Sequence, residues 1–290
     1  MTEYIDLINN VLNSYLPQGD DPEKRLIDAM SYSLQASGKR IRPYLTLAFC
    51  KLCGGSVEDA LPFACAVEMV HTYSLIHDDM PCMDNSMYRR GKESNHIVFG
   101  EDIALLAGDA LHNLAFEIML SDETIEAVGA VKAARASGIL SASIGVSGMV
   151  GGQAIDLQYE NKNAPLEILR HMNLKKTGAL LKAACAIGCI SADADDEKIH
   201  LSQVYGENIG LAFQIIDDIL DKTSTTEILG KSAGSDESHN KSTYLSLLGE
   251  EKCREIVKDL TQKAIDAIKK FDNDFSDLEK LAFDLSVRKS

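Results

Sequence analysis

Nearly every periodic stretch of this chain repeats its apolar residues with the spacing of an α-helix. Between residues 3 and 16, apolar side chains recur at i, i+3, i+4 and i+7, beginning at Tyr4 and ending at Tyr15. Pro43 suits the first turn of a helix, and Gly38 and Gly54 suit the ends of two others. The pattern predicts one all-α domain over residues 1–290, with about ten or more helices.

The composition narrows the classes of function. The chain has 290 residues and a net charge of −15, which argues against a nucleic-acid partner because phosphate backbones need a basic face. The N-terminus lacks the pattern of a signal peptide, and charges interrupt the apolar stretches, so no integral membrane segment is expected. The seven cysteines lie mostly in apolar helical patterns and indicate free thiols in a reducing cytoplasm.

A first group of carboxylates stands directly behind an apolar segment. It comprises Asp78, Asp79 and Asp84, and two arginines follow at positions 89 and 90. Pro81 ends the helix that carries the first two acids, so Asp84 is expected to reach back from a turn. Clustered carboxylates without cysteine or histidine ligands favour a hard cation such as Mg²⁺, whose shell substrate phosphates help to complete.

A second acidic group, Asp217, Asp218 and Asp221, also follows an apolar run. The first and last of these are four residues apart, so on a helix they share a face. One such group alone could be a helix end that passes into solvent. Two groups that face each other across a cavity could hold several Mg²⁺ ions around one diphosphate.

Residues 223–241 are rich in Ser, Gly, Thr and charge, and they predict the one long loop of the chain. Two interpretations stay open for this loop. It is either a functional lid or a disordered surface segment.

Taken in order, the motifs resemble those of the trans-prenyl (polyprenyl) diphosphate synthases, and among them the bacterial-type farnesyl and geranylgeranyl diphosphate synthases. The match runs through GKRIRP at 38–43, HDDMPCMD at 77–84, RRG at 89–91, NHIVFGE at 95–101, LLAGDAL at 105–111, GGQAIDL at 151–157, KKTGAL at 175–180, FQIIDDILD at 213–221 and GKSAGSD at 230–236. The resemblance implies an isoprenoid synthase fold, with helices around a central apolar cavity, and a homodimer. It also implies a reaction that joins an allylic diphosphate head-to-tail to isopentenyl diphosphate, with about three Mg²⁺ ions per active site, for which Mn²⁺ can substitute.

The same resemblance assigns roles to individual residues. The metal ligands are Asp78, Asp79, Asp84, Asp217, Asp218 and Asp221. The allylic diphosphate is bound by Arg89, Lys176, Thr177, Gln214 and Lys231. Isopentenyl diphosphate is bound by Lys39, Arg42, His71 and Arg90. Catalytic roles fall to Lys176, Thr177, Gln214, Asp78 and Asp79. The stretch Ser86–Tyr88 departs from the family, where acidic residues and Leu usually precede the two arginines.

Product length should depend on the depth of the apolar tunnel below the aspartates. Tyr73 lies five residues before Asp78, roughly 7.5 Å along a helix, and the small Ser74 follows it. In bacterial-type farnesyl synthases an aromatic residue at this position resembles a floor that stops the chain at fifteen carbons. Tyr73 therefore favours farnesyl diphosphate, with the twenty-carbon geranylgeranyl diphosphate as the alternative.

Three other classes of protein share parts of this pattern. A non-catalytic subunit of a heteromeric prenyl synthase would have lost aspartates, and both groups are present here. A di-iron helical protein would use Glu68-x-x-His71 and Glu93-x-x-His96, but no matching glutamates occur on other long helices. A terpene cyclase would not need a second, basic diphosphate pocket.

Overall fold

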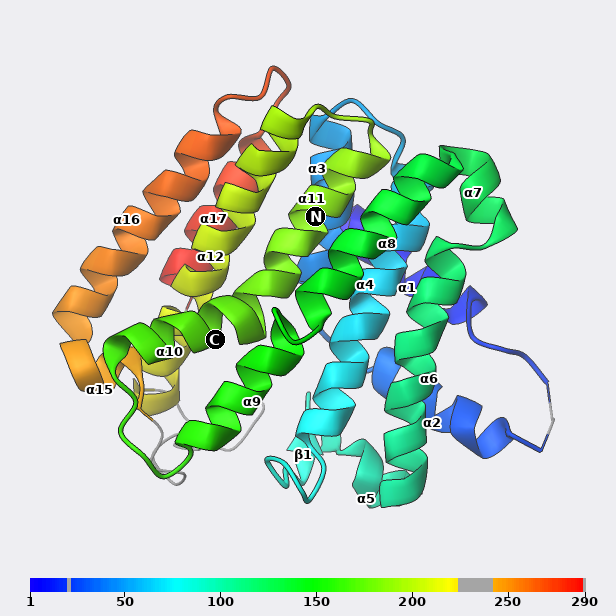
Figure 1. The fold of residues 1–290 in the computed structure, drawn as a ribbon, viewed down its shortest axis with the longest axis horizontal. Coiled ribbons are helices and arrows are strands. Elements are labelled where there is room, and N and C mark those ends of the chain that lie inside the picture. The colour runs from blue at the N-terminus through cyan, green and yellow to red at the C-terminus, as the bar shows by residue number, and fades with distance from the viewer. Residues whose placement is uncertain (20–21, 224–241, 289–290) are drawn as a thin grey trace.

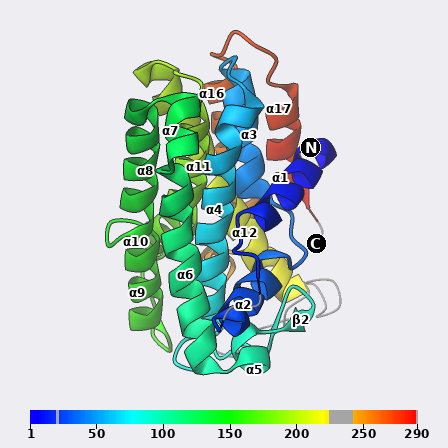
Figure 2. The ribbon, with the colours of Figure 1, turned by 90° about the vertical axis from the view of Figure 1, so that its right-hand side faces the viewer.

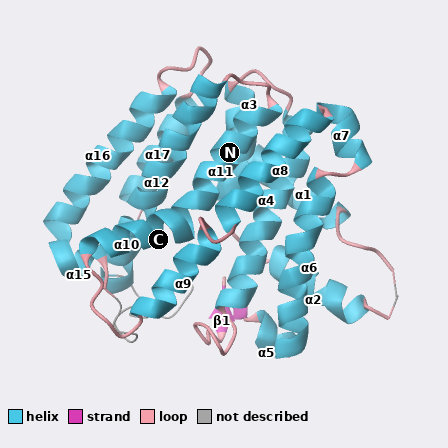
Figure 3. Ribbon diagram, in the orientation of Figure 1, coloured by secondary structure: helices cyan, strands magenta, loops and turns pink. Residues whose placement is uncertain are grey.

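The structure is a computed structural model that describes residues 1–19, 22–223 and 242–288, and this part of the chain is almost entirely helical (Figure 3). The first half forms α1 (Thr2–Ser14), α2 (Lys24–Leu34), α3 (Ile41–Leu52), α4 (Val57–Asp78), α5 (Asn95–Phe99) and α6 (Glu101–Met119). The second half forms α7 (Asp122–Val128), α8 (Ala130–Ile144), α9 (Met149–Tyr159), α10 (Leu166–Asn173), α11 (Ala179–Ser191), α12 (Asp196–Thr223), α15 (Tyr244–Leu248), α16 (Glu250–Ile268) and α17 (Ser276–Val287). The prediction of an all-α fold is confirmed.

The two strands that the described residues contain form one small hairpin. β1 (Tyr88–Arg89) and β2 (Lys92–Glu93) pair antiparallel, with Tyr88 opposite Glu93. Arg90 and Gly91 form the turn, and both have positive φ angles, of 53° and 77°. Glycine adopts this conformation readily, whereas Arg90 needs support from its surroundings.

Residues 122–150 have the apolar spacing of one continuous helix, which the structure does not form. The segment divides into α7, α8 and the start of α9. Gly129, between α7 and α8, has φ 91°, which is outside the helical region. A second break falls at Gly145–Gly148, a turn in which the Gly148 N–H donates to the Gly145 carbonyl at 3.0 Å before α9 begins. Glycines permit both breaks at little cost, and apolar spacing alone does not reveal them.

The core lies around α4, which packs against α3, α6 and α11 (Figures 1 and 2). Most of its apolar side chains are completely buried, including Phe63 and Met69. Close packing extends to α11 on α3, because a Cβ added at Gly188 would lie 2.2 Å from the carbonyl oxygen of Thr46. A second, smaller cluster of buried apolar residues joins α12 to α10, α15 and α16.

The helices that carry the two acidic groups end at the same end of the bundle. In Figure 1 the C-terminal ends of α4 and α12 both lie in the lower half, that of α4 beside the hairpin labelled β1 and that of α12 beside α10 and α15. The partial negative charge of a helix C-terminus adds to the charge of carboxylates placed there. Negative charge is therefore concentrated at this end of the molecule, where bound cations would neutralise it.

One stretch, Ala130–Tyr159, is long and apolar enough to span a membrane by length and composition alone, although the sequence analysis expected none. The bent pair α6–α7 also passes if it is counted as one segment. Within the first stretch, only 28% of the apolar window is buried inside the structure. Within the part of the chain that the structure describes, much of this stretch is therefore exposed.

Candidate active site

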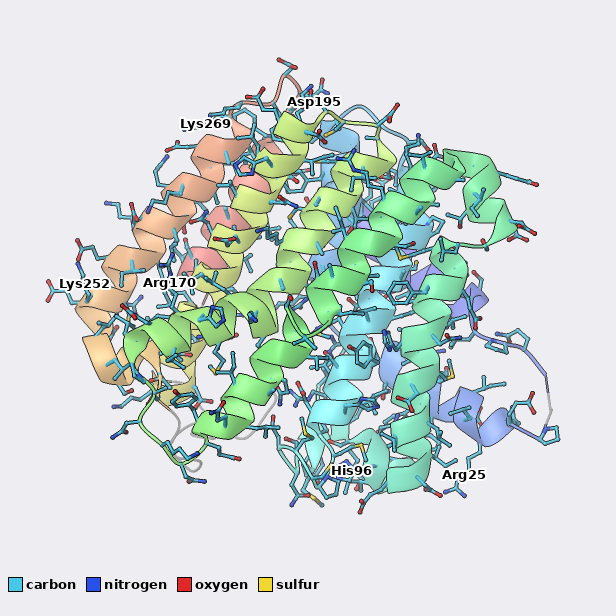
Figure 4. The ribbon with its side chains drawn as sticks, viewed as in Figure 1. Arg25, His96, Arg170, Asp195, Lys252 and Lys269 are labelled. Carbon is cyan, nitrogen blue, oxygen red and sulfur yellow. The ribbon has the colours of Figure 1, made fainter. Side chains whose placement is uncertain are left out.

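The first aspartate group lies where α4 ends, at the end of the bundle where Figure 4 labels His96. Asp78 is the last residue of α4, and the backbone N–H of Asp84 donates to the Asp78 carbonyl at 2.9 Å. The expectation that Asp84 reaches back from a turn is therefore confirmed. Burial raises the pKa of Asp78 to about 6, and the neighbouring Asp84 and Asp79 contribute in the same direction. This carboxyl group lacks full neutralisation by the protein, as expected of a ligand for a cation.

Asp79 and Arg89 form a close pair. The Nε of Arg89 donates to both carboxylate oxygens, at 3.0 and 3.1 Å, and its Nη2 also contacts Asp79. Burial raises the pKa of Asp79, although Arg89 opposes the shift. The family resemblance assigns Asp79 to a metal ion and Arg89 to a diphosphate. In the structure, the charges of these two side chains neutralise each other.

Lys176 joins the first group from the opposite side. It lies in a π-helical turn, Leu174–Gly178, and its Nζ donates to Asp156 of α9 at 2.6 Å. Burial by itself would lower the pKa of Lys176, but the carboxylates of Asp156, Asp78 and Asp84 raise it overall. The ammonium group therefore stays charged beside two aspartates of the first group, Asp78 and Asp84.

Asp156 is a site residue that the sequence analysis did not assign. Its only signal was its position in the GGQAIDL motif, one helical turn after Gly152. That glycine has a packing role, because a Cβ there would lie 2.3 Å from the backbone nitrogen of Lys176. Only glycine lets α9 approach the π-helical turn closely enough for Asp156 to reach Lys176.

A chain of hydrogen bonds links this turn to the second aspartate group. Thr177 Oγ1 donates to Gln214 Oε1 at 3.3 Å, and Gln214 Nε2 donates to Asp218 Oδ1 at 3.3 Å. The backbone N–H of Tyr244 donates to the other oxygen of Asp218 at 2.8 Å. The structure thus brings Thr177, Gln214 and Asp218 together, and one oxygen of Asp218 also anchors the start of α15.

Asp217 has an ion-pair partner that the sequence did not suggest. Arg288, just beyond α17, contacts the Asp217 carboxylate, and its guanidinium lies 3.9 Å from the ring centroid of Phe213. Burial lowers the pKa of Arg288 to about 10. Asp221, one turn after Asp217, is buried at 6% exposure. Arg288, at the C-terminal end of the described chain, therefore adds a positive charge beside the second aspartate group.

Three of the four residues assigned to a basic pocket, Arg42, His71 and Arg90, converge. Arg42 Nη1 and His71 Nε2 are 3.3 Å apart. Burial, followed by the charges of Arg42 and Arg90, holds the pKa of His71 well below its usual range. His71 is therefore neutral, and since guanidinium only donates, His71 Nε2 accepts. Burial and the nearby Arg288 lower the pKa of Lys39.

Tyr73 is buried on α4 and stacks on His112 of α6, with ring centroids 4.8 Å apart and an interplanar angle of 30°. Phe116 meets His112 edge-on at 5.6 Å. Ser74 turns its hydroxyl to the His71 carbonyl at 2.9 Å. The aromatic stack was not predicted, because residues on α4 and α6 that face each other share no sequence pattern.

Two predictions cannot be compared with the geometry. Lys231 and the loop of residues 224–241 lie outside the described residues. Within the ranges that the structure describes, no three His, Cys, Asp or Glu side chains gather in the manner of a complete protein metal site. The half-buried Asp78 and its neighbour Asp84 are the carboxylates that would fit a hard cation whose shell substrate phosphates complete.

The fold and the acid-lined helix ends are those of a known family. A model described as polyprenyl synthetase matches residues 23–281, and the chain belongs to this family. It is 46% identical over 272 residues to the heterodimeric geranylgeranyl pyrophosphate synthase large subunit 1, chloroplastic, of Arabidopsis thaliana, covering 93% of this chain and 73% of that protein. It is 44% identical over 268 residues to the farnesyl diphosphate synthase of Micrococcus luteus, covering 92% and 89%.

A comparison with solved structures agrees with this family assignment. The chain matches a geranyltransferase from Helicobacter pylori, complexed with magnesium and isoprenyl diphosphate, with a TM-score of 0.85 and 30% identity, covering 98% of this chain and 94% of that one. The protein is therefore a transferase of the prenyltransferase class, as the sequence motifs predicted. The relatives include synthases named for both product lengths.

Proposed function

We propose that this prenyltransferase condenses isopentenyl diphosphate head-to-tail with dimethylallyl and geranyl diphosphate to give farnesyl diphosphate. The observation that supports this product is the buried Tyr73, stacked on His112 below the aspartates of α4. Such a floor would stop an elongating chain after fifteen carbons. Geranylgeranyl diphosphate is the alternative product, and relatives such as the Arabidopsis thaliana synthase favour it.

We further propose Mg²⁺ as the cofactor, about three ions per site, with Mn²⁺ able to substitute. Its ligands would come from both acidic groups: Asp78, Asp79, Asp84, Asp217, Asp218 and Asp221. The magnesium named for the Helicobacter pylori relative supports this choice. Bound Mg²⁺ would supply positive charge for the diphosphate that leaves when the allylic carbon–oxygen bond breaks.

The side chains of the site have complementary tasks in this reaction. Lys176 stays charged between the acidic residues and binds the departing diphosphate, and we assign Arg89 and Lys231 to the same group. Thr177 and Gln214 present oxygen dipoles that stabilise the allylic cation. The apolar walls below the aspartates exclude water, which would otherwise capture the cation.

The second substrate has its own pocket. Lys39, Arg42, His71 and Arg90 would bind the diphosphate of isopentenyl diphosphate without a metal ion. Arginine forks suit phosphate oxygens, and the neutral His71 orients one of them. This pocket distinguishes a synthase of two substrates from a terpene cyclase.

Product analysis tests the proposed function. Purified protein is incubated with Mg²⁺, isopentenyl diphosphate and either allylic primer, and the dephosphorylated alcohols are separated by chain length. A dominant fifteen-carbon alcohol, lost on addition of a chelator, is expected. A dominant twenty-carbon alcohol would overturn the product assignment but retain the reaction, and no condensation would favour a non-catalytic subunit.

Replacing Tyr73 by alanine should lengthen the product. The substitution removes the ring that stacks on His112 and opens space below the aspartates. We expect the main alcohol to shift from fifteen to twenty or more carbons, measured in the same assay. Tyr4→Ala is the matched control, because it removes the same kind of ring from α1, where the ring packs against Tyr44 rather than His112. An unchanged product from Tyr73→Ala would mean that Tyr73 is not the floor.

The Mg²⁺ requirement should rise as the pH falls through about 6. The metal-free protein holds the pKa of Asp78 at about 6, above its ordinary value, so the neutral form predominates below that pH. Because Mg²⁺ binds the carboxylate, its half-saturating concentration should increase on the order of tenfold per pH unit there. Mg²⁺ titrations of activity between pH 5 and 8 measure this. A flat dependence would remove Asp78 from the ligand set.

We propose that the protein is a homodimer. Large apolar side chains are exposed on α6, on α8, in the turn after it and at the start of α9: Leu105, Leu106, Val131, Val146 and Val150. Val131 and Val146 are each more than 80% exposed, and a second copy of this chain would bury such a surface. Light scattering should give twice the 31.6 kDa of one chain. Val131→Glu and Val146→Glu should each shift the protein towards the monomer, and a wild-type monomer would contradict the proposal.

With these assignments we propose a single polyprenyl synthase domain over residues 1–290, active in the cytoplasm on small diphosphate substrates. The di-iron alternative finds no support in the geometry. Glu68 is bound to Arg40, and Glu93 lies on β2 rather than on a long helix.

A further inference from the structure

The carboxylate of Glu68 is buried beside the basic pocket that we assign to isopentenyl diphosphate. It is on α4, one turn before His71, and is 1% exposed. Its Oε1 is 2.5 Å from Arg40 Nη1 and 3.7 Å from Arg90 Nη2. In the described part of the chain, Glu68 is the ion-pair partner of both arginines. No sequence motif drew attention to this role.

Arg40 is held more tightly than a surface arginine. Besides Glu68, its guanidinium donates to the carbonyls of Leu34 and Ala36, at 2.7 and 3.1 Å, and to Asn9 at 3.0 Å. Its φ of 47° lies in the left-handed region, which a non-glycine residue adopts only when its surroundings impose it. The buried side chain thus fixes the direction of the backbone at the turn before α3.

This anchored turn carries two of the residues that we assign to isopentenyl diphosphate. Lys39 precedes Arg40 directly, and Arg42 follows it in the first turn of α3. A Cβ at Gly38 would lie 2.9 Å from Arg90 Cζ, so the same turn also packs against Arg90. A shift of Arg40 would therefore move groups on both sides of the pocket.

The pocket also needs a counter-charge. Arg40, Arg42 and Arg90 lie close enough to repel one another, and Glu68 opposes this repulsion. Burial and the nearby Arg90 lower the pKa of Arg42 to about 10, while Glu68 acts against that shift. Because the carboxylate of Glu68 offsets this repulsion, the arginines can stay close enough together to bind one diphosphate.

We propose that Glu68 and Arg40 are positioning residues for the isopentenyl diphosphate pocket: Glu68 binds Arg40 and Arg90 together, and Arg40 holds the turn that presents Lys39 and Arg42. The inference rests on the proposed function, since it concerns the substrate of that same site. Neither residue contacts the substrate in this account.

The test separates the two substrates. Glu68→Gln keeps the shape of the side chain but removes its charge. We expect the KM for isopentenyl diphosphate to rise about tenfold, as for loss of a supporting residue, with the KM for geranyl diphosphate within about twofold of wild type. Glu68→Asp retains the charge and should recover part of the loss.

A purely structural role predicts a different result. Tyr205→Phe is the matched control, because the Tyr205 hydroxyl is buried and donates to the Leu278 carbonyl at 2.7 Å. It lies on α12, roughly 18 Å along the helix from Asp217. This variant should lose thermal stability without changing either KM. If Glu68→Gln behaves like the control, or lowers the KM for isopentenyl diphosphate, the inference is wrong.

Two further outcomes remain informative. If Glu68→Gln fails to fold, Glu68→Asp and Arg40→Lys provide the same comparison. The inference is overturned if each of these variants keeps the wild-type ratio of the KM for isopentenyl diphosphate to the KM for geranyl diphosphate. If the wild-type protein performs no condensation, the proposed function itself fails. A wild type that condenses, with variants that keep its KM values, rejects only the positioning role.

Discussion

Asp78→Asn should lower kcat by about a thousandfold or more. Asparagine has nearly the shape of aspartate but not its charge, so the site would lose a carboxylate next to Asp84 without a change in packing. The loss should persist at saturating substrate, because the charge acts on the departing diphosphate. Steady-state assays with geranyl and isopentenyl diphosphate measure it.

The matched control for this substitution is Asp259→Asn. Asp259 is an exposed residue of α16 that pairs with Lys263, so the same chemical change occurs on the surface. It should leave kcat within about twofold of wild type, since exposed ion pairs contribute little. If Asp78→Asn retained more than about a tenth of the wild-type kcat, the assignment of Asp78 to the metal would be wrong.

Lys176→Gln should lower kcat/KM for the allylic substrate by about a hundredfold or more, because it removes a charged donor aimed at the departing diphosphate. It should also destabilise the protein by about 1–3 kcal/mol, since the part-buried carboxylate of Asp156 would lose its hydrogen bond from Lys176. Activity assays and thermal unfolding separate the two effects.

The double variant Lys176→Gln/Asp156→Asn distinguishes chemistry from stability. Removal of both charges should restore most of the lost stability, because no unpaired carboxylate remains buried. Activity should stay low, because the donor to the diphosphate is still absent. Recovery of activity together with stability would show that Lys176 only maintains the fold.

Local sequence patterns predicted most of the helices, and the family resemblance supplied the roles of the site residues. Apolar spacing indicated the helices, and Pro81 indicated the turn that returns Asp84 to Asp78. These features depend on neighbours within a few residues. They are therefore accessible to sequence patterns.

The residues that sequence analysis missed are partners across long stretches of chain. Asp156 meets Lys176 from another helix, Arg288 meets Asp217, and Glu68 meets Arg40. Each contact depends on how helices pack, which apolar spacing does not specify. The Asp79–Arg89 pair shows a related limit, because both residues were found but not their contact with each other.

The most direct test of this account is a crystal structure of the protein with Mn²⁺, isopentenyl diphosphate and an allylic thiolodiphosphate, whose carbon–sulfur bond resists ionisation. The anomalous signal of Mn²⁺ should appear between the two acidic groups, at Asp78 and Asp84 on one side and Asp217 on the other. Isopentenyl diphosphate should lie against Arg42 and Arg90, with no metal ion on its phosphates. Metal bound at only one acidic group, or both diphosphates bound through metal, would contradict the account.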